Sequence, residues 1–288
     1  MLDYFHNIAV FDKESDSFRY PYHIKMQKNI LNFKEYTVLR VFEKQTHIDL
    51  IGEAKKMSAA YEILAKLYDS IINVKPCFIS SKFRQCNSTF LNEGGGYYEQ
   101  SVVGYEYNNR NFYSYCRGYL ECANLLKQYL TDKYDKGAYC PYLVYPMFYL
   151  YRNNIELQLK SMIFDCSELD IQERCAVVFE NKHKILKLFA FIEDKILPFY
   201  SISKTDPFIV NSKRYCEILH RFDSDSGRFR YPVNKKCNPY QKNKQYYSFI
   251  EIGDFLESLC NAIDGIHSEI EQRAEFLSEM RVENSNYY

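Results

Sequence analysis

Residues 145–164, Y-P-M-F-Y-L-Y-R-N-N-I-E-L-Q-L-K-S-M-I-F, are the most distinctive segment of the chain. They predict a helix that is apolar on nearly every side, and such a helix belongs in the centre of a fold. Arg152, Glu156 and Lys160 follow one another at intervals of four residues, which places them in one stripe along this helix. Charged side chains on a buried helix are costly unless they find partners. We therefore expect either a buried ion pair that fixes helix packing or a functional site.

A second constraint is a duplication at an offset of 211 residues. The segments F-D-K-E-S-D-S-F-R-Y-P-Y-H-I-K at 11–25 and F-D-S-D-S-G-R-F-R-Y-P-V-N-K-K at 222–236 are identical at eight of fifteen positions. Each is followed by a short apolar run ending in glycine, I-D-L-I-G at 48–52 and I-E-I-G at 250–253. Each run leads into a helical pattern, at 53–72 and at 254–277. The repeat predicts a turn, a short strand through F-R-Y-P, a second short strand and a helix.

Within each copy we expect Arg19 or Arg230 to be structural and to bind a carboxylate, with Asp12 or Asp223 of the same hairpin as the candidate. Further helices are predicted at 111–131, at 172–196 with His183 near the middle, and at 211–221. The chain is thus expected to be mainly α, with small β-hairpins and a duplicated hairpin–helix module.

Composition limits the function classes. The 37 basic and 37 acidic residues cancel, so the chain is not a generic polyanion binder, although a local basic patch is compatible with this balance. The ten cysteines show no C-x-x-C pair and no zinc-ligand spacing, which predicts reduced, mostly buried thiols and no metal or other cofactor. Gly94–Gly96 lack the residues of a phosphate-binding loop.

No signal peptide is recognisable at the N-terminus. The longest uncharged apolar stretch, 138–151, has 14 residues and two prolines, too short to span a bilayer. We therefore expect a cytoplasmic protein that does not insert into a membrane.

The second copy of the repeat carries the one marked charge cluster. Six basic residues and no acidic residue lie between 228 and 244, with tyrosines among and beside them: Arg228, Arg230, Lys235, Lys236, Lys242 and Lys244. Basic side chains interleaved with aromatic rings could bind phosphates and stack on bases. The alternative is a solvated hairpin loop.

Taken together, these motifs resemble the bacterial HEPN-like family (higher eukaryotes and prokaryotes nucleotide-binding). The run R-N-N-I-E-L-Q-L-K is similar to the R-H-x-x-E-L-x-L-K helix of that family, and H-K-I-L-K-L at 183–188 is similar to its H-x-L-x-x-L run. The segment 223–232 resembles a D-x-x-S-x-x-F-R-Y-P element that often follows. The resemblance covers about 97–277, in the same order.

The resemblance implies a helical bundle at 97–277, preceded by a partial tail module at 1–75 and a linker at 76–96, and followed by a polar tail at 278–288. Such proteins are commonly dimeric, and many relatives are metal-independent ribonucleases of toxin–antitoxin or anti-phage defence systems. In them an Arg and a His, separated by four to six residues, act on RNA. We accordingly expect RNA and a protein of a defence or toxin–antitoxin complex as binding partners. We also expect the chain to form a homo-oligomer or a hetero-complex.

The catalytic signature itself is only partly matched. Arg152 is followed by Asn153, where relatives often have His, and no His lies within range. Arg214 and His220 match the spacing on a predicted helix, and so do Arg40 and His47 outside any predicted helix. The candidate catalytic residues are Arg152, Glu156, His183, Arg214 and His220. The first hypothesis is a ribonuclease, and the alternative is a non-catalytic sensor or scaffold that retains the fold.

Overall fold

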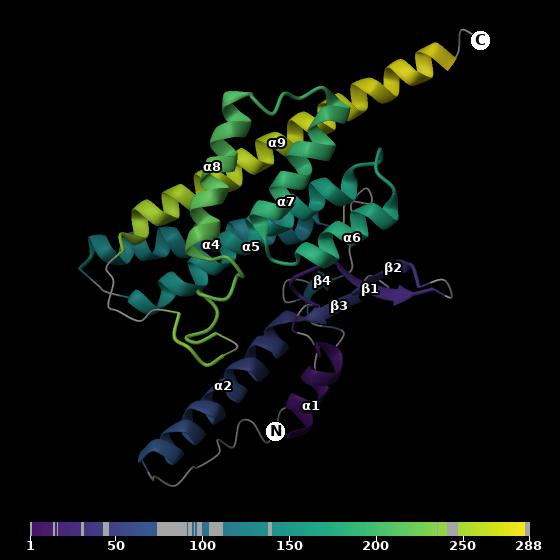
Figure 1. Ribbon diagram of the computed structural model, residues 1–288. Helices are drawn as coiled ribbons and strands as arrows, with labels where there is room; N and C mark the ends of the chain where they lie inside the picture. The colour runs from purple at the N-terminus through teal and green to yellow at the C-terminus, as the bar shows by residue number, and fades with distance from the viewer. Residues whose placement is uncertain are drawn as a thin grey trace. The chain divides into compact units, whose positions relative to one another are not determined.

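The computed structural model describes residues 2–13, 15, 17–29, 32–42, 46–73, 91, 94, 96, 100–103, 112–137, 140–234, 236–240 and 247–285. These residues are mainly helical, as expected (Figure 1). The chain divides into two compact units: Met1–His23 with Leu39–Asn111 form unit 1, and Ile24–Val38 with Phe112–Tyr288 form unit 2. The predicted linker at 76–96 lies almost wholly outside the described residues.

The described helices of unit 1 are α1 (Leu2–Phe11) and α2 (Leu50–Asn73). β3 (Thr46–Asp49) pairs in antiparallel fashion with β4 (Gln100–Val103), with Ile48 opposite Ser101. Tyr4, Ala60 and Ile63 form its small described core. Two further strands, β1 (Tyr22–Lys28) and β2 (Lys34–Arg40), form a separate two-stranded sheet that straddles the boundary between the units.

Unit 2 contains a helical bundle. Its elements are α4 (Tyr113–Asp135), η1 (Pro141–Leu143), α5 (Val144–Asp165), α6 (Ile171–Asn181), α7 (Ile185–Phe191), η2 (Ile192–Ile196), η3 (Leu197–Tyr200), α8 (Pro207–Phe222) and α9 (Phe249–Ser285). The central helix is α5, which contacts α4, α6, α7 and α9. Every residue from 151 to 163 is buried, so the prediction of a central helix apolar on nearly every side is confirmed. None of the helices in the described part of the chain is long and apolar enough to cross a membrane.

The β1–β2 hairpin packs against α6. The Tyr36 backbone N–H donates to Gln172 Oε1 at 2.6 Å, and Gln172 Nε2 donates to the Tyr36 carbonyl at 2.9 Å. The Tyr36 ring lies 5.8 Å from that of Phe179, and Lys34 Nζ lies 2.6 Å from Glu180 Oε1. These contacts explain why Ile24–Val38 belong to unit 2.

The two sequence repeats form the same turn. Ser15 and Ser226, equivalent positions, both adopt the left-handed conformation, with φ of 62° and 60°. Asp12 Oδ1 accepts from the Ser17 N–H at 2.9 Å, and Asp223 Oδ1 accepts from the Arg228 N–H at 3.3 Å. In both copies an aspartate after a helix binds the backbone of the next loop, as Asx turns do.

Aromatic packing repeats as well. The rings of Phe11 and Phe18 lie 5.8 Å apart, and the equivalent rings of Phe222 and Phe229 lie 5.6 Å apart. The duplicated residues therefore specify a closed turn that follows a helix in each copy.

Two expectations about the repeat were wrong, namely the strand through F-R-Y-P in both copies and the second short strand at I-E-I-G in the second copy. F-R-Y-P forms turns rather than strands: β1 begins at Tyr22, after the proline, and among the described residues of the second copy an isolated bridge joins Val233 and Pro239. The aspartates bind backbone N–H groups and hold the loop in this turn. The I-E-I-G run at 250–253 belongs to α9, and I-D-L-I-G passes from β3 into α2 after Asp49.

Each arginine of the repeat donates a hydrogen bond to an oxygen of its own copy. Arg230 Nε donates to the Ser226 carbonyl at 2.7 Å, and Arg19 Nη2 donates to the Tyr20 hydroxyl at 2.9 Å. In the second copy the expected pair with Asp223 is replaced, because Asp223 Oδ1 accepts from the backbone N–H groups of Gly227 and Arg228. Arg230 is therefore structural through a backbone carbonyl of its own turn.

Candidate functional site

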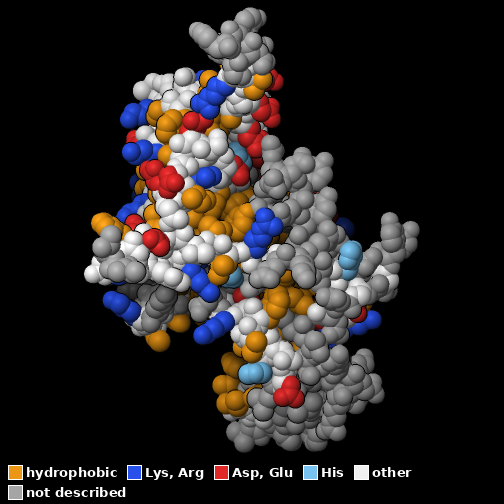
Figure 2. Space-filling model, turned by 90° about the vertical axis from the view of Figure 1, so that its right-hand side faces the viewer, with side chains coloured by type: hydrophobic (Ala, Val, Ile, Leu, Met, Phe, Trp, Pro, Cys, Tyr) orange, Lys and Arg blue, Asp and Glu red, His pale blue; other side chains and the backbone are white. Residues whose placement is uncertain are grey.

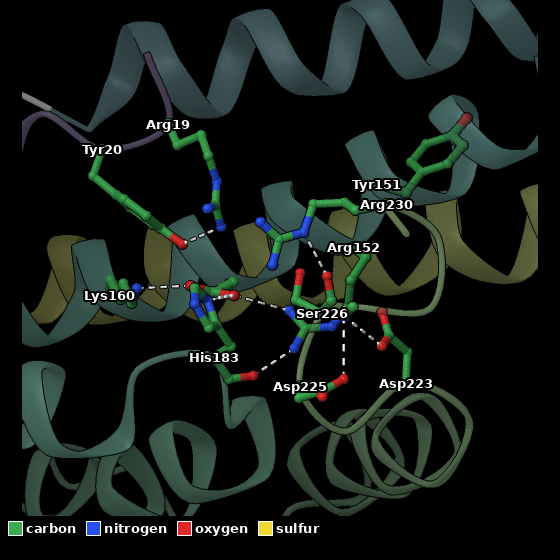
Figure 3. A network of polar contacts seen from close by, with 12 residues as sticks. Arg19, Tyr20, Tyr151, Arg152, Lys160, His183, Asp223, Asp225, Ser226 and Arg230 are labelled. Carbon is green, nitrogen blue, oxygen red and sulfur yellow. Dashed lines mark hydrogen bonds and ion pairs between the residues drawn. The ribbon is translucent and has the colours of Figure 1, made fainter. Parts of the chain in front are cut away.

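The charged stripe of α5 forms an ion cluster inside unit 2 (Figure 3). Glu156 Oε2 lies 3.2 Å from Arg152 Nη1, and Glu156 Oε1 lies 2.7 Å from Lys160 Nζ. The side chains of Arg152 and Glu156 are 0% exposed, and that of Lys160 is 7% exposed. The i, i+4 spacing along α5 sets this geometry, because it stacks the three side chains on consecutive turns.

His183 joins this cluster from a turn between two helices. The sequence predicts one helix over 172–196, but α6 ends at Asn181 and α7 begins at Ile185. Lys182, with a φ of 47°, breaks the helix, and its N–H still donates to the Val178 carbonyl at 3.0 Å. The break places His183 at the cluster rather than in the middle of a helix.

Both the ring and the backbone of His183 are held by α5. Its Nδ1 lies 3.1 Å from Oε1 and 3.2 Å from Oε2 of Glu156. Its carbonyl accepts from Arg152 Nη2 at 2.5 Å. The His183 side chain is 29% exposed, whereas the two side chains that hold it are fully buried. Among these three residues, only His183 reaches the surface of unit 2.

The electrostatics of the cluster fix the hydrogen-bonding roles. Burial would raise the pKa of Glu156, but the charges of Lys160 and Arg152 and the hydrogen bond from His183 outweigh it and hold that pKa well below its ordinary value. Glu156 is therefore ionised and can only accept hydrogen bonds. It follows that His183 Nδ1 carries a proton, and that Nε2 is the basic nitrogen of the neutral ring.

The end of α8 faces the same cluster. Burial lowers the pKa of His220, and the charges of Arg152 and Lys184 lower it further. Burial raises the pKa of Asp223, although the Arg152 charge opposes this. Within the described residues, His220 Nδ1 and Asp223 Oδ2 are buried without a hydrogen-bond partner. The predicted residues Arg152, Glu156, His183 and His220 thus lie in one electrostatic neighbourhood, and the sequence did not single out Asp223 as a member of it.

Arg214 does not belong to this neighbourhood. It is exposed on α8, whereas Cys216 and Leu219 of the same helix are buried and His220 is partly buried. Six residues along a helix correspond to a rotation of about 240° beyond a full turn, so the motif spacing places Arg214 and His220 on different faces. Arg40 ends β2 and His47 lies in β3, so this pair does not share an element either.

The basic turn after α8 is described only in part, since Lys235, Lys242 and Lys244 fall outside the described residues. The Arg228 guanidinium lies 4.7 Å from the ring centre of Phe222, and that of Arg230 lies 5.1 Å from the ring centre of Tyr231. In the parts of the chain that are described, neither arginine forms an ion pair with a carboxylate. Lys236 is exposed.

On the face shown in Figure 2, basic and acidic side chains are interspersed with hydrophobic patches and form no extended basic surface among the described residues. Any binding of nucleic acid on this face would therefore depend on local clusters. In the described segments, no group of three or more His, Cys, Asp or Glu side chains could hold a metal ion.

A cavity of about 530 Å³ lies between α8, the second F-R-Y-P turn and the start of α9. Its lining is mostly apolar and consists of Ile218, Leu219, Arg221, Phe222, Phe229, Glu251, Ile252, Phe255 and Leu256. None of the predicted catalytic residues lines it, so the ion cluster and this cavity are separate features.

Eight of the ten cysteines are described, and all eight are free thiols. Four are buried and two are partly buried, while Cys122 and Cys237 are exposed.

Comparisons with protein families, with curated proteins and with solved structures found no match for this chain.

Proposed function

We propose that the chain is an RNA-acting effector of bacterial anti-phage defence or of a toxin–antitoxin system, and that it is a metal-independent ribonuclease of the HEPN-like kind. The observation that carries this proposal is the contact of His183 Nδ1 with both oxygens of the buried Glu156 carboxylate. A carboxylate behind an imidazole fixes its tautomer and orientation, which is the usual arrangement of a general acid–base histidine.

In this mechanism the Nε2 atom of His183 accepts the proton of an RNA 2′-hydroxyl group. The 2′-oxygen forms a bond to the adjacent phosphorus, and the bond from phosphorus to the 5′-oxygen breaks. The proton is then returned to the departing 5′-oxygen. The products are a 2′,3′-cyclic phosphate and a 5′-hydroxyl end, and the reaction needs no oxidant or reductant.

Arg152 has a positioning role here, because a side chain with no exposed surface cannot contact a phosphate. It holds the His183 carbonyl and balances the charge of Glu156. Stabilisation of the phosphorane is assigned instead to Arg230, which lies beside the cluster in Figure 3 and whose Nε is held by the Ser226 carbonyl. Arg228, whose guanidinium lies over the Phe222 ring, is assigned to phosphate binding along the RNA. This differs from the family signature, in which the arginine itself acts on the phosphate.

A second candidate is a non-catalytic sensor or scaffold subunit of a defence complex. The observation that favours it is the complete burial of Arg152 and Asn153, the two residues that begin the family signature. In this case the ion cluster specifies helix packing, and the chain contributes a binding surface to a protein partner in the cytoplasm.

The discriminating experiment is cleavage of total RNA and of tRNA in buffer containing EDTA. We expect wild-type protein to cleave and His183→Gln to lose at least about a hundredfold in rate, as loss of a general acid–base group does. His6→Gln, a matched substitution of an exposed histidine on α1, should keep full activity. Absence of cleavage by folded wild-type protein, with no growth arrest on expression, would reject the ribonuclease proposal. Cleavage that His183→Gln leaves unchanged would reject the assignment of His183.

A further inference from the structure

The cavity of about 530 Å³ between α8, the second F-R-Y-P turn and the start of α9, which we call the α8–α9 cavity, has no part in the proposed RNA chemistry. Its floor is formed by Leu219, Phe229 and Leu256, which are at most 8% exposed and belong to the hydrophobic core of unit 2. Small-molecule binding sites are typically concave and mostly apolar, with volumes of roughly 300–1,000 Å³. The α8–α9 cavity therefore has the size and lining of a site for a small molecule.

The aromatic rings that line the α8–α9 cavity are held in place by their neighbours. The Phe255 ring stacks on that of Tyr215, with ring centres 4.8 Å apart. The Phe229 ring meets that of Phe148 of α5 edge to face at 5.2 Å, and the Phe222 ring lies 5.6 Å from that of Phe229. Ring pairs at these separations attract one another and favour one arrangement of the side chains. The cavity is therefore formed before a ligand enters it, which lowers the cost of binding.

The charges at the α8–α9 cavity favour an anionic ligand group. Arg221 and Glu251 both line the cavity and are both exposed. In the described part of the chain Arg221 forms no ion pair, and its Nε donates a long hydrogen bond of 3.4 Å to the Glu217 carbonyl of its own helix. The Arg228 guanidinium lies 4.7 Å from the ring centre of Phe222, which also lines the cavity. Two positive charges and one negative charge thus lie at the cavity, so an anion is attracted more strongly than a cation.

We propose that the α8–α9 cavity binds a small amphipathic carboxylate, such as a free fatty acid of medium chain length. The hydrocarbon part fills the apolar interior, and its removal from water supplies most of the binding free energy. The carboxylate pairs with the Arg221 guanidinium, whose two parallel N–H groups match the two oxygens and fix the orientation of the ligand. Apart from Arg221 and Glu251, the side chains that line the cavity are hydrocarbon, so a ligand with polar groups along its whole length would lose hydrogen bonds on entering.

Isothermal titration calorimetry of the full chain with decanoate, 1-decanol and decylamine at neutral pH tests this proposal, because the three compounds share a hydrocarbon chain and differ in the charge of the head group. We expect decanoate to bind about tenfold more tightly than decanol, and decylamine to bind most weakly. Arg221→Gln should abolish the advantage of decanoate and leave decanol unaffected. Arg214→Gln, the same substitution at an exposed arginine of α8 that does not line the cavity, should change neither affinity. Glu251→Gln should strengthen decanoate binding, because it removes a repelling charge.

The place of binding can be tested by fluorescence, because the chain contains no tryptophan and a single introduced indole reports on one location. Decanoate should change the emission of Phe255→Trp, whose indole lines the cavity. It should leave unchanged the emission of Phe276→Trp, which lies on the same helix at a position that is 60% exposed and outside the cavity. Where Phe255→Trp does not fold, Ile218→Trp at the 41% exposed edge of the cavity provides the same measurement.

Three results would overturn the proposal. They are the absence of binding of all three compounds to folded wild-type protein, an affinity for decylamine equal to or above that for decanoate, and a decanoate affinity that Arg221→Gln leaves unchanged. An emission change in Phe276→Trp with none in the cavity variants would place the ligand elsewhere and overturn it as well. None of these measurements involves RNA or His183, so the proposal stands or falls independently of the proposed ribonuclease activity.

Discussion

Replacing Glu156 by glutamine should destabilise unit 2 strongly, although the two side chains have nearly the same volume. The substitution removes the negative charge that lies among Arg152, Lys160 and His183. Arg152 is completely buried and would keep its positive charge without the carboxylate that pairs with it. Breaking a buried pair by removing one partner typically costs about 3–5 kcal/mol, and we expect a loss in this range at pH 7.

Glu180→Gln is the matched control. It makes the same chemical change at an ion pair with Lys34 in which both side chains are about half exposed, so solvent screens the pair and we expect little or no loss of unfolding free energy. Urea unfolding followed by circular dichroism, with midpoints and slopes compared, measures both losses. Equal small losses of unfolding free energy in Glu156→Gln and Glu180→Gln would refute the dependence of unit 2 on this buried charge.

The difference in unfolding free energy between wild type and Glu156→Gln should also decrease as the pH falls. The pKa of Glu156 is lower in the folded chain than its ordinary value of 4.5. The ionised carboxylate therefore contributes its full stability above about pH 4.5, and this contribution is lost as the pH falls through the folded-state pKa. We expect the urea unfolding midpoints of wild type and Glu156→Gln to converge in acid.

Three further predictions concern other parts of the chain. Asn153→Leu should leave stability unchanged or raise it by about 1 kcal/mol in urea unfolding, because the Asn153 amide is buried with no hydrogen-bond partner in the described structure; a loss above about 2 kcal/mol would contradict this. Ser15→Val should cost about 1–2 kcal/mol in the thermal unfolding of unit 1, whereas Ser15→Gly should not, because Ser15 has a φ of 62°. Burial raises the pKa of Cys216 to about 12, so mass spectrometry after brief alkylation should find exposed Cys122 modified and Cys216 intact. Equal labelling of the two cysteines would show that α8 is not packed as described.

The sequence predicted elements where pattern alone decides structure. The helix at 145–164 followed from apolar residues on every side, and its charged stripe from the spacing of Arg152, Glu156 and Lys160. The partners of that stripe could not be predicted in the same way. His183 reaches Glu156 because Lys182 adopts a positive φ, which the residues 181–184 do not signal by a glycine. A helix break without glycine or proline escapes pattern reasoning.

The repeat shows the opposite case, in which sequence identity was clear and its structural meaning was not. F-R-Y-P has the residues of a short strand, yet Asp12 and Asp223 bind backbone N–H groups and close a turn around Ser15 and Ser226. Local side-chain to backbone hydrogen bonds override strand propensity in such segments. The match of Arg214 with His220 illustrates a further limit, because spacing along a helix says nothing of which face is buried.

Our central claim is that ionised Glu156 fixes His183 with the proton on Nδ1 and leaves Nε2 as the basic nitrogen. Nitrogen-15 NMR of protein labelled at its six histidines measures the tautomer directly, and His183→Gln identifies the signal. We predict the Nδ1-protonated form for the neutral ring, with a change of tautomer population in Glu156→Gln. A neutral His183 ring protonated on Nε2 in the wild type would contradict the claim, and with it the acid–base role proposed for this residue.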